Sequence, residues 1–309
     1  MLLLAIACAT AAPPTPLPDA FWSTWGDGNA ELSSYDLVQP RYGEPRPGTL
    51  VNIVVTEDFS HGERVKADPG EHPAADIRKV LKLNSHRSFQ TGVYPYSVLT
   101  SSFLRVDPGD GQGRGDPLKI AFSAQEWCGM VYDEMLVDAG RIRHTTHTYF
   151  DSDNTQPQTF NIGGGALYGD AMTVSVRELT GSWIQGTPTA YPYFPASVAP
   201  RFGHRAPGPT TLRVHRGASE TRPGVLGPVA AHPVVTQTTD DVVTTYWVED
   251  AWPHRLLEYA SSNGESATLR GSARMPYWSL NNPGDEAQRA AFGLDPVVYT
   301  PQAPASPTP

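Results

Sequence analysis

The sequence predicts a mainly β protein with few helices, in which an open or incomplete antiparallel barrel packs on one central helix. The 309-residue chain contains 28 glycines and 30 prolines without a collagen-like period, which is typical of short strands joined by frequent turns. Several stretches alternate apolar and polar residues with a period of two, most clearly residues 119–137. Residues 166–179 are the one substantial stretch with a helical pattern.

Composition limits the classes of function. Hydrophobic residues make up 39% of the chain and charged residues only 18%, which indicates a globular body with room for a large core. The formal net charge is −9 and no long Lys/Arg run occurs, so we expect no nucleic-acid partner. No stretch of the body approaches the ~18 consecutive apolar residues that a spanning helix needs.

The N-terminus predicts export and lipidation. Residues 1–8, MLLLAIAC, place Cys8 after a short apolar run and the small residue Ala7, which resembles the lipobox of bacterial lipoprotein signal peptides. Ala5 stands where Leu is usual, the start lacks Lys or Arg, and the apolar run is short. A start codon assigned too far downstream would explain the last two features, and the alternatives are a trimmed ordinary signal peptide or a structural cysteine. Residues 9–20 are small and proline-rich, which predicts an extended tether.

The first β half is expected over residues 21–185, and it opens with a short helical turn. Trp22 and Trp25, three residues apart, are expected on one side of this turn, packed on the sheet. Core packing is the favoured role for both, and a stacking platform for a sugar or acyl ligand is the alternative. After the Asp27-Gly28 turn, residues 32–37 alternate and predict a strand.

The chain then predicts further strands around polar loops. Residues 60–77 contain Lys66 among carboxylates and histidines whose spacings match no metal-ligand pattern, so we expect a solvated loop. The other expected segments are strands at 49–59 and 78–83, two short strands within 89–106 that meet at Gly92 or Pro95, and a turn-rich loop at 107–116.

Residues 119–137 read as one half-buried strand whose even positions are apolar. Glu126 interrupts this apolar face, and a buried carboxylate is costly unless it is paired or protonated. It is therefore either a structural ion-pair partner, which we favour, or a functional group. Cys128 stands beside it, and because negative charge and burial both raise a thiol pKa, we expect a buried, unreactive free thiol.

A turn at Asp138-Ala139-Gly140 leads into a second strand at 141–150, expected to pair antiparallel with the first. His144 and His147 differ in parity, so they should point to opposite faces, and we expect no metal site. The expected helix at 166–179 carries one apolar stripe, formed by Leu167, Ala171, Val174 and Leu179.

The rest of the chain predicts a connection, a meander and a tail. Residues 186–209 are rich in proline and read as an extended connection, residues 210–293 as a C-terminal β meander, and residues 294–309 as a disordered tail. The elements expected in the meander are strands at 210–216, 234–239, 242–248, 255–259, 267–269 and 275–280, turns at Asp240-Asp241 and Asn263-Gly264, and a short helix at 284–293.

Residues 21–43, together with the segment Gln125-Glu126-Trp127-Cys128-Gly129, resemble a group of uncharacterised bacterial exported proteins and lipoproteins, some of which are labelled septum formation inhibitor Maf. Maf proteins are cytoplasmic nucleotide pyrophosphatases with a Ser-Pro-Arg-Arg signature, which this chain lacks. The aromatic run from Tyr246 to Trp278 is similar to the C-terminal hairpins of periplasmic half-barrel carriers of the LolA/LolB kind. The resemblance implies a half-barrel architecture and brings no activity with it.

Two functions remain open. The first is a lipid-anchored cell-envelope protein, placed at the outer membrane and facing the periplasm or the cell surface, that binds a lipid or other amphipathic ligand or acts as a structural partner. Its expected ligand-binding residues are Glu126, Gln125, Trp127, Lys66, Arg41, Trp22 and Trp25. The second is an envelope hydrolase that uses Glu126 as general acid or base with Asp36, Glu57 or His144. No nucleophile elbow, zinc motif, Walker loop or Cys-x-x-Cys occurs, so no cofactor is expected.

Overall fold

The structure is a computed structural model that describes residues 17–151, 153 and 155–297. The expected signal peptide, Cys8, most of the tether and the last twelve residues of the tail lie outside the described residues. In the part of the chain that the structure describes, no helix has the length and apolar character needed to cross a membrane.

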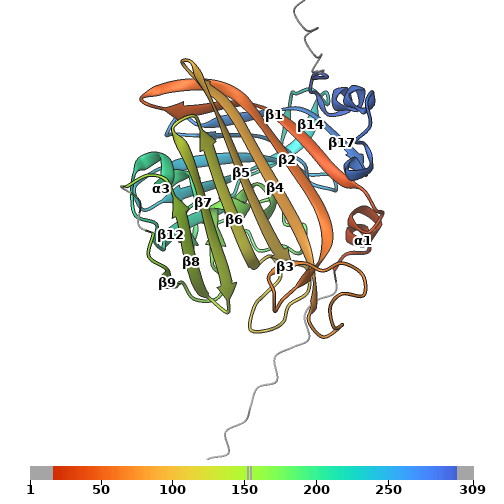
Figure 1. Cartoon of the computed structure of the whole chain (residues 1–309). Coiled ribbons are helices and arrows are strands. Elements are labelled where there is room, and N and C mark those ends of the chain that lie inside the picture. Colours follow the sequence, from red (N-terminus) through yellow and green to blue (C-terminus); the bar gives the residue numbers. More distant parts are fainter. Residues whose placement is uncertain (1–16, 152, 154, 298–309) are drawn as a thin grey trace, which may run out of the picture.

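The chain forms one large, curved and mainly antiparallel sheet that does not close into a barrel, which confirms the predicted fold class (Figure 1). β1 (Ala30–Arg41) is the joining strand, because it pairs with β2 (Glu44–Ser60) on one side and with β17 (Ser266–Met275) on the other. Both expected halves, 21–185 and 210–293, therefore contribute to the same sheet.

On the β2 side, each strand pairs with the next in an antiparallel meander. These strands are β4 (Ile77–Thr91), β5 (Tyr94–Arg105), β6 (Pro117–Glu126), β7 (Gly129–Asp138), β8 (Arg141–Thr148) and β9 (Gln158–Asn161), with the short β3 (Val65–Lys66) paired to β2.

On the β17 side, the sheet runs back through the C-terminal hairpins and ends at a short parallel strand. These strands are β16 (Leu256–Ser261), β15 (Val243–Glu249), β14 (Val229–Thr238), β12 (Thr210–Arg216), β11 (Thr189–Phe194) and β10 (Leu167–Tyr168), with β13 (Glu220–Arg222) beside β14. The predicted turns at Asp240-Asp241 and Asn263-Gly264 both lie between paired strands.

The stretch 119–137 is a hairpin and not one strand. β6 ends at Glu126, β7 begins at Gly129, and these two residues face each other across a two-residue turn. The buried parity changes at this turn: Ile120 and Phe122 are buried at even positions of β6, whereas Val131 and Met135 are buried at odd positions of β7. The apolar residues Cys128 and Met130 continue the even-numbered alternation of β6 through the turn and into β7. The sequence pattern therefore predicted one strand, although the chain reverses direction at the turn.

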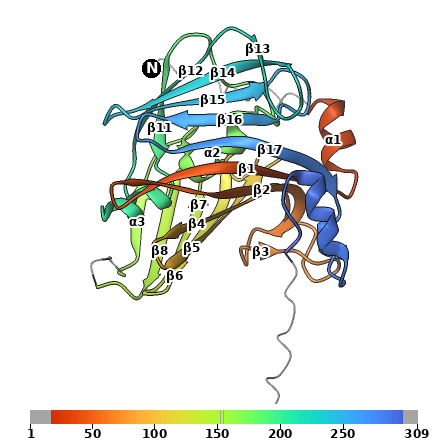
Figure 2. The ribbon, with the colours of Figure 1, turned by 90° about the horizontal axis from the view of Figure 1, so that it is seen from above.

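The expected helix at 166–179 is also wrong in its length. Only α2 (Met172–Ser175) is α-helical, and β10 and a 3-10 turn, η1 (Gly169–Ala171), precede it. Residues 162–188, which we call the plug, lie on the concave side between the two parts of the sheet (Figure 2). Ala171 and Val174 pack with the β4–β8 part, whereas Met172 and Val176 pack with the β11–β17 part. Burial on two sides, with a glycine and β-branched residues, replaces the single stripe of a longer helix.

The N-terminal helix α1 (Asp19–Trp25) begins inside the range expected to be tether. Phe21 and Trp25, four residues apart, share its buried face, whereas Trp22 is 41% exposed. Core packing is therefore confirmed for Trp25 and wrong for Trp22. In this short helix the buried face is formed by Phe21 and Trp25, which are four residues apart, and not by Trp22 and Trp25, which are three apart.

Three details of the C-terminal part also differ from prediction. The 186–209 connection contains a strand of the sheet, β11, and a helix, α3 (Val198–Gly203). β17 runs unbroken to Met275 and is followed by the 3-10 turn η2 (Tyr277–Ser279), so 275–280 is not a strand. The expected terminal helix is the 3-10 helix η3 (Asp285–Phe292), and Leu294 after it is buried against the start of β1, so the tail is packed where it begins.

Candidate functional site

The structure places the sequence-predicted residues around Glu126 on an exposed turn. Gln125 and Trp127 are exposed, and the half-buried carboxylate of Glu126 accepts a hydrogen bond of 2.8 Å from the backbone N–H of Cys128. Cys128 itself is an exposed free thiol, so the expectation of burial is wrong. The reason is the hairpin reversal, which puts this residue in the turn and not on the apolar face of a strand. The carboxylate of Glu126 also accepts a hydrogen bond from the thiol, and this bond raises the pKa of the thiol.

Arg41 lies at the same end of the sheet as this turn, where β1, β5 and β6 all begin or end. It is buried between the rings of Tyr42 and Phe202, 4.1 and 4.7 Å from their centroids, and it donates 3.0 Å to the Phe202 carbonyl. Its guanidinium is therefore occupied by contacts within the protein.

Lys66 and Trp25 lie at the other end, where β2 ends and β1 begins. Lys66 is exposed and forms an ion pair with Asp68 at 2.8 Å, and Trp25 is part of the core. The structure therefore does not bring the seven predicted ligand-binding residues together into one site.

The proposed acid–base partners of Glu126 are also distant from it. His144 pairs with Met135, six residues along β7 from the turn, which corresponds to about 20 Å. Asp36 lies four strands away across the sheet and Glu57 forms an ion pair with Lys82 at 3.1 Å. His144 instead faces Asp133 at 3.7 Å in a small cavity of about 150 Å³.

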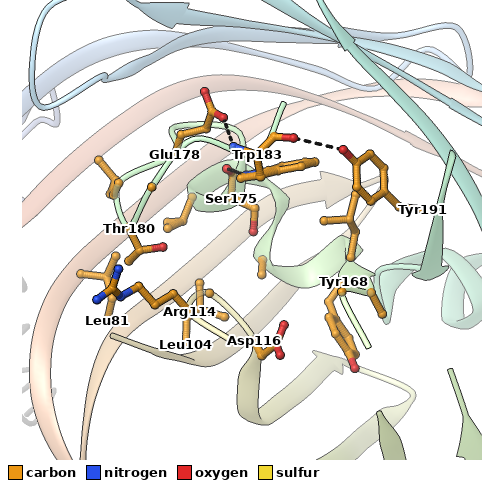
Figure 3. A pocket seen from close by; sticks show the side chains of 18 of the residues that line it. Leu81, Leu104, Arg114, Asp116, Tyr168, Ser175, Glu178, Thr180, Trp183 and Tyr191 are labelled. Atoms are coloured by element: carbon orange, nitrogen blue, oxygen red, sulfur yellow. Dashed lines mark hydrogen bonds between the residues drawn. The ribbon is translucent and has the colours of Figure 1, made fainter. Parts of the chain in front are cut away.

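Two larger cavities lie on the concave side, and sequence reasoning missed both. The first, of about 340 Å³, is shown in Figure 3 and is called the loop cavity here. Leu81 of β4 and Leu104 of β5 form one wall, and the plug forms the other. Trp183 also lines this cavity: the Glu178 carboxylate accepts its backbone N–H at 2.5 Å, and the Tyr191 hydroxyl donates 3.1 Å to its backbone carbonyl (Figure 3).

Asp116 is the acidic side chain of the loop before β6 that reaches the loop cavity (Figure 3). Burial raises its pKa, and a hydrogen bond of 2.7 Å from the Gly113 N–H opposes that rise. Burial also raises the pKa of Tyr168, which lines the same cavity. Both groups therefore favour their neutral forms more than they would in water.

The second and larger of the two, of about 430 Å³, is called the tyrosine cavity here. Tyr193, Tyr246 and Tyr259 line it from β11, β15 and β16. Apolar lining residues come from the plug, from the end of β11 and from the chain around α3, and we call them the apolar wall: Met172, Phe194, Pro195, Val198 and Pro200. These residues can accept hydrocarbon, while the three tyrosines, which we call the polar wall, offer hydroxyl groups.

An ion pair stands at the polar wall of the tyrosine cavity. Arg87 of β4 donates 2.7 Å to Glu265 and 2.9 Å to the side-chain oxygen of Gln39. Tyr259 donates 2.7 Å to the same carboxylate oxygen of Glu265. Burial of the two phenols and the nearby negative charge of Glu265 raise the pKa of Tyr246 and of Tyr259, so both phenols stay protonated and can donate.

Asp170 of η1 lies behind the cavity wall and ties the plug to the chain that begins α3. Its carboxylate accepts hydrogen bonds from the backbone N–H of Ser197, at 3.0 and 3.1 Å, and from the Ser197 hydroxyl at 2.8 Å. Burial raises the pKa of Asp170 to about 6, which outweighs the opposing effect of these hydrogen bonds and of Arg87. No local motif marks Arg87, Asp170 or Glu265, which are far apart in the chain, so the sequence offers no signal for this site.

No protein-family model matches the chain, and no curated protein matches it. Among solved structures, the chain is similar to the crystal structure of a β-barrel-like protein of the domain of unknown function DUF1849 from Brucella abortus. The identity is 10%, the match covers 80% of this chain and 98% of that chain, and the TM-score is 0.47. The resemblances to bacterial lipoproteins and to Maf proteins stay predictions.

Proposed function

We propose that this protein is a lipid-anchored protein of the bacterial cell envelope that binds an amphipathic ligand in the tyrosine cavity. The observation that carries the proposal is the cavity itself, which has about 430 Å³, one apolar wall and one hydrogen-bonding wall. Ligand sites of about 300–1,000 Å³ with few placed polar groups are the usual form of small-molecule sites.

The anchor belongs to the same proposal. Cys8 would carry the lipid, and the proline-rich residues 9–16 would hold the body away from the membrane surface. The body would then face the periplasm or the cell surface from the outer membrane. Transfer of a radiolabelled fatty acid to the wild-type protein, and its loss in Cys8→Ser, tests this part independently of the cavity.

In the tyrosine cavity, binding is favoured over hydrolysis by where the carboxylates lie. Glu126 is on an exposed turn away from both cavities, and Glu265 is committed to Arg87 and Tyr259. General acid–base catalysis needs a carboxyl group within hydrogen-bond reach of a bound substrate, in an environment that tunes its pKa. Asp170 has such a pKa, but Ser197 occupies its oxygens.

A fluorescence titration with the neutral probe N-phenyl-1-naphthylamine tests the cavity. The wild-type protein should bind the probe, and Ala199→Trp should weaken binding at least about tenfold, because Ala199 is an exposed residue at the cavity wall where an indole would take up cavity space. Ala287→Trp is the matched control, because Ala287 is exposed on η3 and does not line the cavity.

Mass spectrometry of organic extracts of the purified wild-type protein gives a second measurement, in which a co-purified amphiphile should be present and should be depleted in Ala199→Trp. A wild-type protein that binds no probe and carries no amphiphile would overturn the proposed function.

A further inference from the structure

The charges at the tyrosine cavity cancel among the described residues. Four charged side chains line it, and they form two ion pairs, Arg87 with Glu265 at 2.7 Å and Arg205 with Asp240 at 3.7 Å. The first pair is largely buried at the polar wall, and the second is exposed at the rim. A ligand that enters therefore meets no uncompensated charge on the cavity lining.

An anionic group would gain little from Arg87. Its guanidinium already donates to Glu265 and Gln39, and Asp170 behind the wall interacts with it electrostatically. Two carboxyl groups thus surround one guanidinium, and a third negative group would be repelled and would lose its hydration.

A cationic group would gain little from Glu265. One oxygen of this carboxylate accepts from Arg87 and from Tyr259, each at 2.7 Å, and the other lies 3.5 Å from the side-chain nitrogen of Gln39. Displacing these partners would leave Arg87 without its counter-charge in a largely buried position, which is strongly unfavourable.

The polar side chains that remain for a ligand are neutral, and most of them are hydroxyls. The Tyr246 O–H lines the cavity and makes no hydrogen bond with any residue that the structure describes. Thr244 and Ser261, which also line it, are bonded to each other at 3.0 Å and keep acceptor lone pairs. Hydroxyl groups of a ligand match such a wall, because each can donate and accept at once.

We infer that the ligand carries an uncharged, polyhydroxylated polar end, as an alkyl glycoside or a monoacylglycerol does, which lies against Tyr246 and Tyr259. Its hydrocarbon part packs on the apolar wall formed by the plug and the chain around α3. This inference rests on the proposed function and names the chemical class of the ligand at the same cavity. The phenol rings also offer flat apolar faces on which the ring of a sugar can pack.

Displacement of bound N-phenyl-1-naphthylamine by three amphiphiles of equal chain length tests the inference. Octyl glucoside, octanoate and octylammonium are compared at pH 7.5, each below its micelle-forming concentration. Octyl glucoside should displace the probe at a concentration at least about tenfold lower than either charged amphiphile, because only the charged heads lose hydration without compensation.

A charged amphiphile that displaces the probe as well as octyl glucoside does would overturn the inference and leave the proposed function standing. A wild-type protein that does not bind the probe would instead remove the proposed function, and the inference with it.

Two variants locate the polar end. Tyr246→Phe should weaken octyl glucoside about fivefold and leave octanoate unchanged, because one neutral hydrogen bond is lost. Tyr149→Phe, on an exposed residue outside the cavity, is the matched control. Glu265→Gln should raise the affinity for octanoate, because Arg87 loses its counter-charge. Equal octyl glucoside affinity in wild type and Tyr246→Phe would contradict the placement of the hydroxyl groups, even if Glu265→Gln fails to fold.

Discussion

Arg177 of the plug and Glu31 of β1 form a bidentate ion pair at 2.8 and 2.9 Å, and both side chains are almost fully buried. Arg177 also donates to the carbonyls of Pro253 and His254, so its guanidinium links the plug to β1 and to the loop between β15 and β16. Arg177→Ala should lower the free energy of unfolding by about 3–5 kcal/mol, because Glu31 is left buried without a partner.

Urea unfolding of Arg177→Ala measures this loss. Arg143→Ala is the control, since Arg143 forms a half-exposed pair with Asp138, and it should cost below about 1 kcal/mol. A loss in Arg177→Ala no larger than in the control would contradict the prediction.

Cys128 is a second residue whose chemistry depends on one neighbour. It is exposed, and the hydrogen bond and charge of Glu126 raise the pKa of its thiol. The folded protein should react with a maleimide without denaturant, and Glu126→Gln should react faster at pH 7, because a lower pKa gives more thiolate. Stopped-flow labelling measures both rates, with Gln125→Ala as the control on the adjacent exposed residue. Equal rates in wild type and Glu126→Gln would refute the role of the carboxylate.

Asp170 gives a pH dependence with a definite sign. Its pKa rises to about 6 in the folded protein from an ordinary value of 3.8, so the folded state holds the proton more tightly than the unfolded state. Its contribution to stability is therefore fully present below pH 4 and is lost as the pH rises through 6, by up to about 3 kcal/mol.

The unfolding free energy of wild type minus that of Asp170→Asn should fall between pH 4 and pH 7 by up to this amount. Urea titrations at both pH values measure it, and the subtraction cancels the other titrating groups. A difference that does not change with pH would show that Asp170 keeps an ordinary pKa.

At the scale of elements, the close approach of η1 to the chain before α3 shapes the tyrosine cavity. A Cβ on Gly169 would lie 2.2 Å from the Ala196 nitrogen and 2.6 Å from the Tyr193 hydroxyl. Gly169→Ala must therefore push these segments apart, at a cost of about 1–3 kcal/mol. It should also break the hydrogen bonds between Asp170 and Ser197 and weaken binding of the naphthylamine probe.

Gly186→Ala is the control for that substitution, because no atom lies within 4 Å of the position a Cβ would take there and its backbone φ is not positive. Thermal unfolding and probe titration of the two variants measure the effects. A Gly169→Ala variant that matches Gly186→Ala in both would mean that the two segments do not need this contact.

Strands and hairpins were predictable where the local alternation of apolar and polar residues and a single turn motif determine them. The strand at 49–59, the hairpin around Asp240-Asp241 and the opposite faces of His144 and His147 follow from local alternation, and the structure confirms each. The prediction of a helix at 166–179 was wrong because it assumed one apolar stripe, whereas these residues are buried on two sides. Tertiary packing decides such a segment.

At the scale of the whole molecule, the pairing of β1 with β17 and the cavity between the two parts of the sheet could not be read from the chain. The strands β1 and β17 are separated by more than two hundred residues, and neither carries a pairing signal for the other. Arg87, Asp170 and Glu265 likewise meet only because the sheet curves around the plug. The fold class was predictable because it depends on the local alternation of apolar and polar residues. The site depends on the pairing of strands that are far apart in the chain, which no local pattern indicates.

This closure predicts that the chain unfolds as one unit. Residues 17–161 contain β1 to β9, but in isolation β1 would lose β17, and the apolar side chains of Val54, Leu81 and Met135 would lose the plug that covers them. An exposed apolar sheet face and a free central edge favour aggregation over folding. The full chain should give a single urea transition by circular dichroism and by tryptophan fluorescence, whereas fragments 17–161 and 162–297 should each be insoluble or lack a cooperative transition. Co-expression of the two fragments should restore a soluble complex, because it restores both the β1–β17 ladder and the covered face. A fragment 17–161 that unfolds cooperatively alone would show instead that the first half is an independent domain and that the second half only docks on it.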